Sequence, residues 1–424
     1  MRGSPFSRCL VAASCAAALL VAIPASAKLL IPMDASQTDH LRAYGVAYRA
    51  LARGETVEWL LNYRGGSFFL DETSVGEQDC LLSGVTFSLA GAGEVGQAYS
   101  EIEGANMELV LLEKAPKMAV YAPSSMEPWD DAVTLALNYA DIPFDQIYDE
   151  EVLGGKLSQY DWLHLHHEDF TGQYGKFYSS YHSAPWYLEQ QARSELAAET
   201  AGYTTVWQHK HAVARRIREY VAQGGFLFAM CSGADSYEIA LAAGEVDIVD
   251  VPFDGDPPDP GAAGRMDFSQ CLAFENFTID TNPMVYEFSD LDMTQQAALR
   301  GPDSDFFTLF EFSAKEDPVP TMLTQCHVNV LSGFMGQTTS FKKSLVKKGA
   351  LILAETDGAG EVRYLHGNYG QGTFTYYGGH DPEDYQHRVG DPPTELELHK
   401  NSPGYRLILN NILFPAAEKK ERKT

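Results

Sequence analysis

Short apolar runs alternate along this chain with longer segments whose apolar residues recur at helical spacing. The runs 28–33 (KLLIPM) and 56–63 (TVEWLLNY) have the length and composition of buried strands, and 36–53 between them has the period of a helix. We expect these three segments to form a βαβ unit, with parallel strands and a right-handed crossover. Repeated alternation of this kind indicates an α/β protein, with an open, mostly parallel sheet flanked by helices.

The alternation restarts after Ala115-Pro116, which predicts two units. We expect an N-terminal α/β segment over 28–114 and a larger domain over 115–418. Residues 174–223 indicate a helical insertion with helices at 186–201 and 206–223. Other predicted helices lie at 94–102, 128–139, 231–243 and 403–414. Predicted strands lie at 85–89, 117–121, 144–148, 160–166, 226–230, 247–251, 350–355, 362–366 and 373–377, with several β-like runs over 272–325 and a basic tail at 419–424.

The first 27 residues have the features of a secretory signal peptide. Arg2 and Arg8 precede an apolar run over 10–23, and A-S-A at 25–27 is an A-x-A cleavage site. A lipoprotein cut before Cys15 is the alternative. The apolar run is short for a membrane span. We therefore expect an exported protein, periplasmic or extracellular, with no stable membrane span.

Charge and cysteine spacing exclude several classes of function. The chain has 424 residues and a net charge of -27, from 31 Lys and Arg against 58 Asp and Glu. Such a surface repels phosphate backbones, which argues against nucleic-acid binding. Six cysteines without a C-x-x-C pair make neither a disulfide framework nor a cysteine zinc site. We expect no cofactor and a small polar substrate or ligand, and the oligomeric state is not readable from the residues.

The segment G-G-F-L-F-A-M-C-S-G-A-D-S at 224–236 is the sharpest local signal. It predicts a buried strand that turns tightly into a helix with Cys231 at the turn. A nucleophile in such a turn needs small neighbours, and Ala229 and Gly233 fit that need. A helix N-terminus lowers a thiol pKa and offers N–H groups to an oxyanion. The alternative is that Cys231 is a small buried apolar residue at a strand end.

A partner base is predicted from Y-G-Q-G-T-F-T-Y-Y-G-G-H-D-P-E at 369–383. His380 follows a strand there, and in a parallel sheet it would lie at the same edge as Cys231. Glu383 or Asp381 could orient the imidazole, as a catalytic triad requires. The alternative for His380 is a hydrogen-bonded loop histidine.

These two motifs resemble the class I glutamine amidotransferase-like superfamily, over roughly residues 116–415. The tail is most similar to the trehalose-utilisation (ThuA-like) branch, and the cysteine turn is similar to the N-terminal domain of biotin-protein ligase. The resemblance implies a flavodoxin-like sheet, with Cys231 as nucleophile, His380 as base and Glu383 as its orienter. Ala229 and Pro382 depart from the family pattern, and His166-His167-Glu168-Asp169 replaces its oxyanion-loop glycines.

The same turn also supports a different interpretation. S-G-A-D-S at 232–236 is similar to the S-G-G-x-D-S pyrophosphate loop, and the whole chain resembles exported bacterial proteins labelled "asparagine synthetase B". That label implies a glutamine-hydrolysing, ATP-dependent synthetase. Three observations argue against this activity: the loop is one residue short, cleavage would leave Lys28 rather than a cysteine at the N-terminus, and export removes the ATP supply.

A cluster of polar residues ends the strand predicted at 160–166. We expect His166, His167 and Glu168 to join Ser232 and Gly233 in binding substrate or its oxyanion. We predict no metal, with His164, His166 and Glu168 as the alternative ligand set. The sequence thus favours a Cys-dependent amide or ester hydrolase, and the second hypothesis is a non-catalytic protein of the same fold that binds a small sugar-like ligand.

Overall fold

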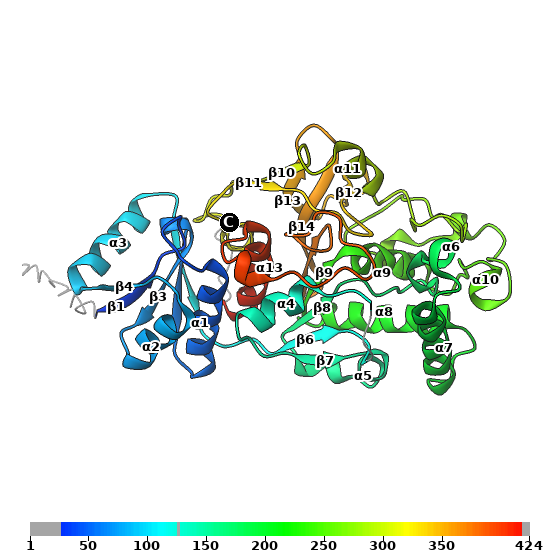
Figure 1. Cartoon of the computed structure of the whole chain (residues 1–424), viewed down its shortest axis with the longest axis horizontal. Helices are drawn as coiled ribbons and strands as arrows, with labels where there is room; N and C mark the ends of the chain where they lie inside the picture. The colour runs from blue at the N-terminus through cyan, green and yellow to red at the C-terminus, as the bar shows by residue number, and fades with distance from the viewer. Residues whose placement is uncertain (1–26, 125–127, 418–424) are drawn as a thin grey trace, which may run out of the picture.

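The structure is a computed structural model that describes residues 27–124 and 128–417. It is an α/β protein with two sheets that follow one another along the long axis of the molecule (Figure 1). The chain leaves the first sheet after Leu112 and enters the second at Met118. The predicted signal peptide, apart from its last residue, and the predicted basic tail lie outside the described residues.

The N-terminal sheet is antiparallel throughout, with the strand order β4-β1-β3-β2-β5. Two of its helices follow strands β1 and β3, and the third precedes β5. The elements are β1 (Lys28–Ile31), α1 (His40–Ala52), β2 (Val57–Leu61), β3 (Ser67–Asp71), α2 (Ser74–Ser83), β4 (Ser88–Ala90), α3 (Ala92–Gly104) and β5 (Glu108–Leu112).

The predicted parallel βαβ unit is wrong in its pairing. Strands β1 and β2 do not touch, because β3 lies between them and is antiparallel to both, which is a split βαβ arrangement. The cause is the turn after β2. Asn62, Arg64, Gly65 and Gly66 all have positive φ, which reverses the chain within a few residues. The hairpin it forms places β3 on the edge of β2 that β1 would have needed.

The second sheet has ten strands, and its parallel half positions the site. Strands β7, β6, β8, β9 and β15 are neighbours in that order and parallel. The other half is antiparallel and continues from β15 through β14, β13, β10 and β11, with β12 paired to β14. The strands are β6 (Met118–Tyr121), β7 (Asp145–Ile147), β8 (Trp162–Leu165), β9 (Phe226–Met230), β10 (Phe306–Leu309), β11 (Val330–Ser332), β12 (Phe341–Lys342), β13 (Ala350–Thr356), β14 (Glu361–Tyr369) and β15 (Gly372–Tyr377).

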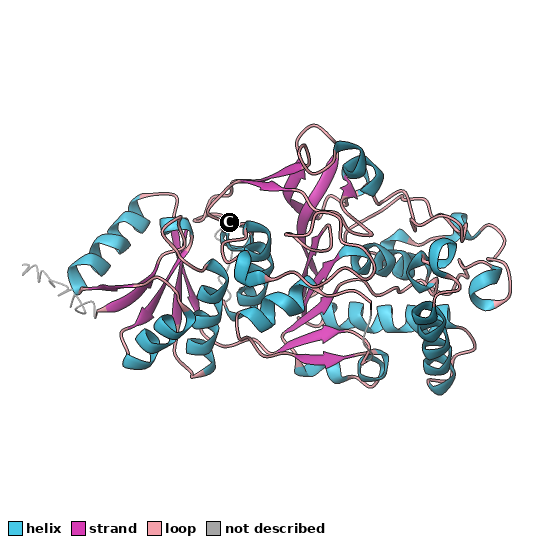
Figure 2. Ribbon diagram, in the orientation of Figure 1, coloured by secondary structure: helices cyan, strands magenta, loops and turns pink. Residues whose placement is uncertain are grey.

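Helices cover both faces of this sheet (Figure 2). Alternate residues of β9 explain the layering: Phe228 packs in one core with α4 and α13, and Leu227 packs in the other with α8 and α9. The helices are α4 (Ala132–Tyr139), α5 (Asp149–Leu153), α6 (Tyr178–Tyr181), α7 (Pro185–Thr200), α8 (Val206–Ala222), α9 (Cys231–Ala243), α10 (Val251–Asp254), α11 (Thr294–Arg300), α12 (Pro318–Leu323) and α13 (Pro403–Leu413).

Most predicted elements of the larger domain are confirmed, and two are wrong. Residues 247–251 form no strand: they are irregular up to α10, and the Asp247 carboxylate accepts from the Val249 N–H in a local turn. Residues 272–325 hold a single named strand, β10, among irregular segments and the helices α11 and α12. The apolar side chains there pack individually into the cores on the two sides of the sheet, which does not require strand pairing.

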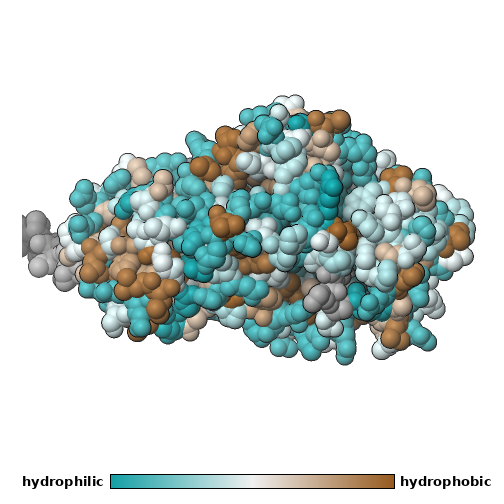
Figure 3. Space-filling model, in the orientation of Figure 1, coloured by the Kyte–Doolittle hydropathy of each residue, from teal (hydrophilic) through white to brown (hydrophobic). Residues whose placement is uncertain are grey.

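The hydropathy of the surface can be followed in Figure 3. The face in Figure 3 is mostly hydrophilic, with hydrophobic residues gathered chiefly over the N-terminal sheet. Among the described residues, the structure contains no helix with the length and apolar character needed to cross a bilayer.

Candidate functional site

Four parallel strands deliver polar side chains to one edge of the second sheet. Cys231 follows β9, His380 follows β15 by three residues, and His166 follows β8. Asp130 and Asp131 lie in the segment after β6, where Asp131 caps α4. Because these strands are parallel neighbours, their carboxyl ends meet, and side chains far apart in sequence converge.

Cys231 occupies the tight turn that the sequence predicts. Its φ is 48°, in the left-handed region that a residue with a Cβ seldom adopts, while Met230 before it is extended and α9 begins at Cys231 itself. Gly233 makes this turn possible, because a Cβ there would lie 2.6 Å from the carbonyl oxygen of His166. A strained residue between a strand and a helix has the backbone geometry known from nucleophile elbows.

The segment 334–340 covers the thiol. The backbone N–H of Gln337 donates to the Cys231 sulfur at 3.2 Å, and only 2% of Cys231 is exposed. A Cβ on Gly336 would lie 3.0 Å from that sulfur and 2.7 Å from the backbone nitrogen of His380, so glycine lets the covering chain come this close. Sequence reasoning missed this segment, and Gly336 in F-M-G-Q-T-T-S was the only signal in it.

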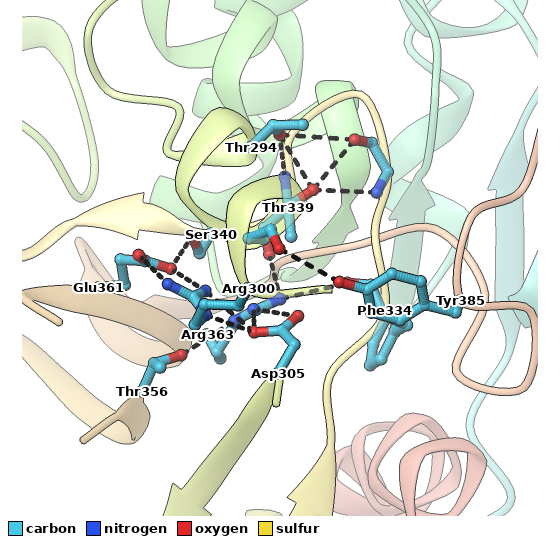
Figure 4. Close-up of polar contacts among 12 residues, drawn as sticks. Thr294, Arg300, Asp305, Phe334, Thr339, Ser340, Thr356, Glu361, Arg363 and Tyr385 are labelled. Carbon is cyan, nitrogen blue, oxygen red and sulfur yellow. Dashed lines mark hydrogen bonds and ion pairs between the residues drawn. The ribbon is translucent and has the colours of Figure 1, made fainter. Parts of the chain in front are cut away.

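Buried charges hold the covering segment in place (Figure 4). Arg363 on β14 donates to the carbonyl oxygens of Phe334 and Thr339 at 3.1 and 3.2 Å. Its other nitrogen pairs with both carboxylate oxygens of Asp305 at 2.6 and 2.7 Å. Arg300 bonds the same Asp305 and also Glu361, which completes a network of two arginines and two carboxylates. The cover is thus built into the antiparallel half of the sheet.

The Cys231 thiol and the His380 imidazole act on each other electrostatically. Burial alone would raise the thiol pKa, but the hydrogen bond and charge of His380, with backbone N–H groups of Thr338 and Ser232, lower it below its usual value. Burial alone would lower the pKa of His380, but hydrogen bonds and charges of Asp130 and Cys231 raise it to about 10. Both directions favour a thiolate–imidazolium pair.

The carboxylate beside His380 is Asp130, which corrects the prediction of Glu383. The Nε2 atom of His380 lies 3.7 Å from Asp130 Oδ1, and His387 Nε2 lies 3.1 Å from the same oxygen. Glu383 pairs instead with His399 at 2.8 Å, because Pro382 carries the chain past the imidazole before the glutamate. The Asp381 carboxylate accepts from the Glu383 N–H at 2.8 Å and shapes that turn.

The other face of His380 meets a row of histidines. His380 Nδ1 lies 3.0 Å from His166 Nε2, and His166 Nδ1 lies 3.3 Å from His164 Nε2. Asp131 flanks the row, 3.3 Å from His166 Nδ1 and 3.4 Å from His164 Nε2. Burial lowers the pKa of His166 to about 3, more than the charge of Asp131 raises it, so His166 is neutral. The sequence predicted the histidines but no role for Asp131.

The residues predicted to bind substrate lie around the turn, mostly engaged in its own hydrogen bonds. The Gly233 N–H donates to the His166 carbonyl at 2.6 Å, and the Ser232 hydroxyl donates to the His167 carbonyl at 3.2 Å. Glu168 accepts from the His166 N–H at 3.2 Å. The backbone N–H of Ser232 is the one group of these that faces the sulfur.

Several groups of atoms at this edge are spaced closely enough to hold a divalent cation. His164 and His166 converge with Asp131 rather than with Glu168, which corrects the alternative ligand set drawn from the sequence. Glu168 instead turns back to the backbone of its own loop. The other two groups at this edge both contain His380: one adds His166 and His167, and the other adds Asp130 and His387.

Large clefts in the described part of the molecule lie away from Cys231. One of about 770 Å³ opens at the opposite edge of the sheet, where Phe226 and Gly372 begin their strands. Another of about 850 Å³ lies between α5, α7 and α8. A small cavity of about 20 Å³ adjoins His167 and Trp129. Among the described residues of the site, Cys231 and His380 are both buried, with 2% and 5% of their surfaces exposed.

Comparison with known proteins does not indicate a function. No family model and no curated protein match the chain. Among solved structures, two cytoplasmic proteins of Salmonella typhimurium align with TM-scores of 0.36 and 0.37 at 11% and 12% identity, covering 72% and 71% of this chain and all of each of theirs. A β-galactosidase from Bacillus circulans sp. alkalophilus aligns with a TM-score of 0.25 at 14% identity, covering 64% of this chain and 29% of its own. Function therefore has to be argued from the site.

Proposed function

We propose that this protein is an exported cysteine hydrolase that cleaves an amide or ester bond in a small polar substrate, on a flavodoxin-like domain of the class I amidotransferase-like type. The observation that carries the proposal is the position of Cys231, strained in the left-handed region at a strand–helix turn, next to His380 at the same sheet edge. A buried structural cysteine needs neither the strain nor the imidazole.

The proposed reaction has two halves. The Cys231 thiolate attacks the carbonyl carbon, and the carbonyl π electrons move to its oxygen, near the N–H groups of Ser232 and Gln337. Collapse of this intermediate breaks the bond to the leaving nitrogen or oxygen, which takes a proton from the His380 imidazolium. Water then gives a proton to His380 and attacks the thioester, which releases the acid and restores the thiolate.

Two other functions fit less well. The first is a non-catalytic protein that binds a small sugar-like ligand at this edge. The low exposure of Cys231 supports it, because a reactive thiol normally needs access to solvent, but it leaves the strained backbone and the neighbouring imidazole unexplained. An ATP-dependent synthetase gains no support from the S-G-A-D-S segment. Its residues lie buried in the first turns of α9, and the Gly233 N–H is already bonded to His166 rather than open to a phosphate.

The test is alkylation with iodoacetamide, followed by peptide mass spectrometry across a range of pH. Burial raises the pKa of Cys80 to about 12 and also raises that of Cys271 and Cys326, so these three thiols are internal controls. We expect Cys231 to react at pH 7 at least tenfold faster than any of them. Its rate should fall only as the pH drops below the lowered thiol pKa, because the thiolate is the nucleophile.

Two variants complete the test. His380→Ala should move the midpoint of Cys231 alkylation upward, because the stabilising imidazolium is gone. Glu383→Gln should leave it in place, since Glu383 contacts His399 instead. A native Cys231 that reacts no faster than Cys326 would contradict the hydrolase and favour the binding protein.

A further inference from the structure

We propose that His166, backed by Asp131, is the positioning residue that holds the Nδ1–H of His380 and leaves Nε2 as the nitrogen that exchanges the catalytic proton. This inference rests on the proposed hydrolase function and names the group that takes the place predicted for Glu383. It gives the site the order Cys231, His380, His166, Asp131.

The geometry places His166 between the two partners. Its Nε2 lies 3.0 Å from His380 Nδ1, and its Nδ1 lies 3.3 Å from Asp131 Oδ1. The His166 side chain is fully buried, so water does not compete for either nitrogen. A neutral imidazole has one N–H and one lone pair, and both are used when each nitrogen faces a protein partner.

The proton positions follow from these neighbours. The pKa of Asp131 is held well below its usual value, since the two histidines outweigh the effect of burial, so Asp131 is a carboxylate and can only accept. The single N–H of neutral His166 therefore lies on Nδ1, toward Asp131. Its Nε2 presents a lone pair, and the hydrogen bond between the two rings forms only when His380 Nδ1 is the donor.

Backbone contacts lock this arrangement to the fold. Asp131 is the N-cap of α4, and its Oδ1 accepts from the backbone N–H groups of Val133 and Thr134 at 2.7 and 3.0 Å. His164 is held in turn, because its Nδ1 can only donate to the Phe228 carbonyl oxygen at 3.1 Å. His164 and Phe228 are also paired across β8 and β9. The helix and two strands thus fix the row of rings from both sides.

The consequence for catalysis lies in His380. With Nδ1–H committed to His166, only Nε2 can lose and regain a proton. Nε2 lies 3.7 Å from Oδ1 of Asp130, the carboxylate that helps to raise the pKa of His380. In a catalytic triad a carboxylate holds the Nδ1–H directly. Here a neutral imidazole does so, with the carboxylate one ring further back.

The test compares two His166 variants by the pH profile of Cys231 alkylation. His166→Phe keeps a ring but removes the acceptor, and we expect at least a tenfold slower reaction at pH 7 with an upward shift of the midpoint. His166→Gln retains a side-chain acceptor and should recover most of the rate. His211→Phe is the matched control, because His211 is equally buried but bonds the Gly244 carbonyl oxygen outside the site; it should leave the midpoint unchanged.

Nitrogen-15 NMR of the histidine rings supplies a second readout. At pH 7 the signals that disappear in His166→Phe should show a protonated Nδ1 and an unprotonated Nε2. A protonated Nε2, or a His166→Phe midpoint equal to that of the native protein, would overturn the relay while the hydrolase stands. Stoichiometric zinc that is lost with His166→Phe would overturn it too, since these nitrogens would then be ligands. If native Cys231 is inert, the hydrolase itself fails.

Discussion

At the scale of single residues, the backbone at Cys231 is strained, which costs the folded state free energy. A non-glycine residue held at positive φ costs about 1–3 kcal/mol, and the surrounding structure must hold it there. Gly233 and Gly336 permit that by letting backbone approach the cysteine from two sides. The strained turn at Cys231 is therefore held by contacts with the segments of His166 and Gly336, and is not a loose turn.

One turn further along α9, Asp235 predicts how stability depends on pH. Burial raises its pKa to about 8, above the value near 3.8 in an unfolded chain. Between these values the folded state keeps a proton that the unfolded state releases, so stability falls as the pH rises from about 4 to 8. Asp235→Asn removes this dependence. In denaturant unfolding, the free energy of unfolding of the variant relative to the native protein should therefore be higher at pH 8 than at pH 5. The exposed control Asp303→Asn should show no such gain; an equal gain would refute the assignment.

At the scale of elements, the cover over the thiol depends on strand β14. Arg363 is 1% exposed and Asp305 is fully buried, so their pair lies outside the reach of solvent. The same arginine supplies the hydrogen bonds that hold both ends of the covering segment 334–340. The antiparallel half of the sheet thereby positions the covering segment 334–340, whereas the parallel half positions Cys231 and the histidines.

Arg363→Met tests this anchor. It leaves the buried Asp305 with Arg300 alone, and we expect a loss of about 3–5 kcal/mol in the free energy of unfolding. Amide hydrogen exchange in residues 334–340 should rise more than in β9. The control is Lys343→Met, which breaks the more exposed pair of Lys343 with Glu355 and should cost less than about 1 kcal/mol. Similar losses in the two variants would contradict the anchoring role.

At the scale of the whole molecule, helix α13 joins the two sheets. It packs against α1 of the N-terminal unit and against α4 and α12 of the larger one (Figure 1). Buried Arg406 on α13 donates to the Met33 carbonyl oxygen at 2.9 Å and to the Tyr44 hydroxyl at 3.1 Å. Asn410 on the same helix accepts from Tyr44 and donates to the carbonyl oxygens of Leu323 and Gln325. One continuous core therefore spans both sheets.

This continuity predicts cooperative unfolding. Hydrogen exchange during denaturation should give one midpoint for amides of β3 and of β9 in the native protein. Arg406→Ala leaves buried acceptors without their donor, and we expect the free energy of unfolding to fall by about 1–3 kcal/mol. Both midpoints should then move to lower denaturant together. A fall confined to β3 would show that the two sheets unfold independently.

Local pattern accounts for what was predicted correctly. The strand of F-L-F-A-M, the turn at Cys231 and the helix after it each depend on residues within a few positions, and the parallel neighbours β9 and β15 then bring His380 to the same edge. Which strands pair with which could not be predicted from local pattern. The alternation of β1, α1 and β2 is the same for a parallel unit and for a split one, and only the hairpin into β3 distinguishes them.

The sequence by itself determined the α/β class and the sheet edge where Cys231, His380 and His166 gather, because strand and helix periods are local properties. Only the tertiary structure decided that Asp130 and Asp131, rather than Glu383, flank the histidines, and that Gln337 covers the thiol. These partners come from segments more than 90 residues away from the groups they contact, with the exception of Asp131 and its histidines. Hydrophobic periodicity predicts local elements, but it does not predict which distant loops come into contact in the folded protein.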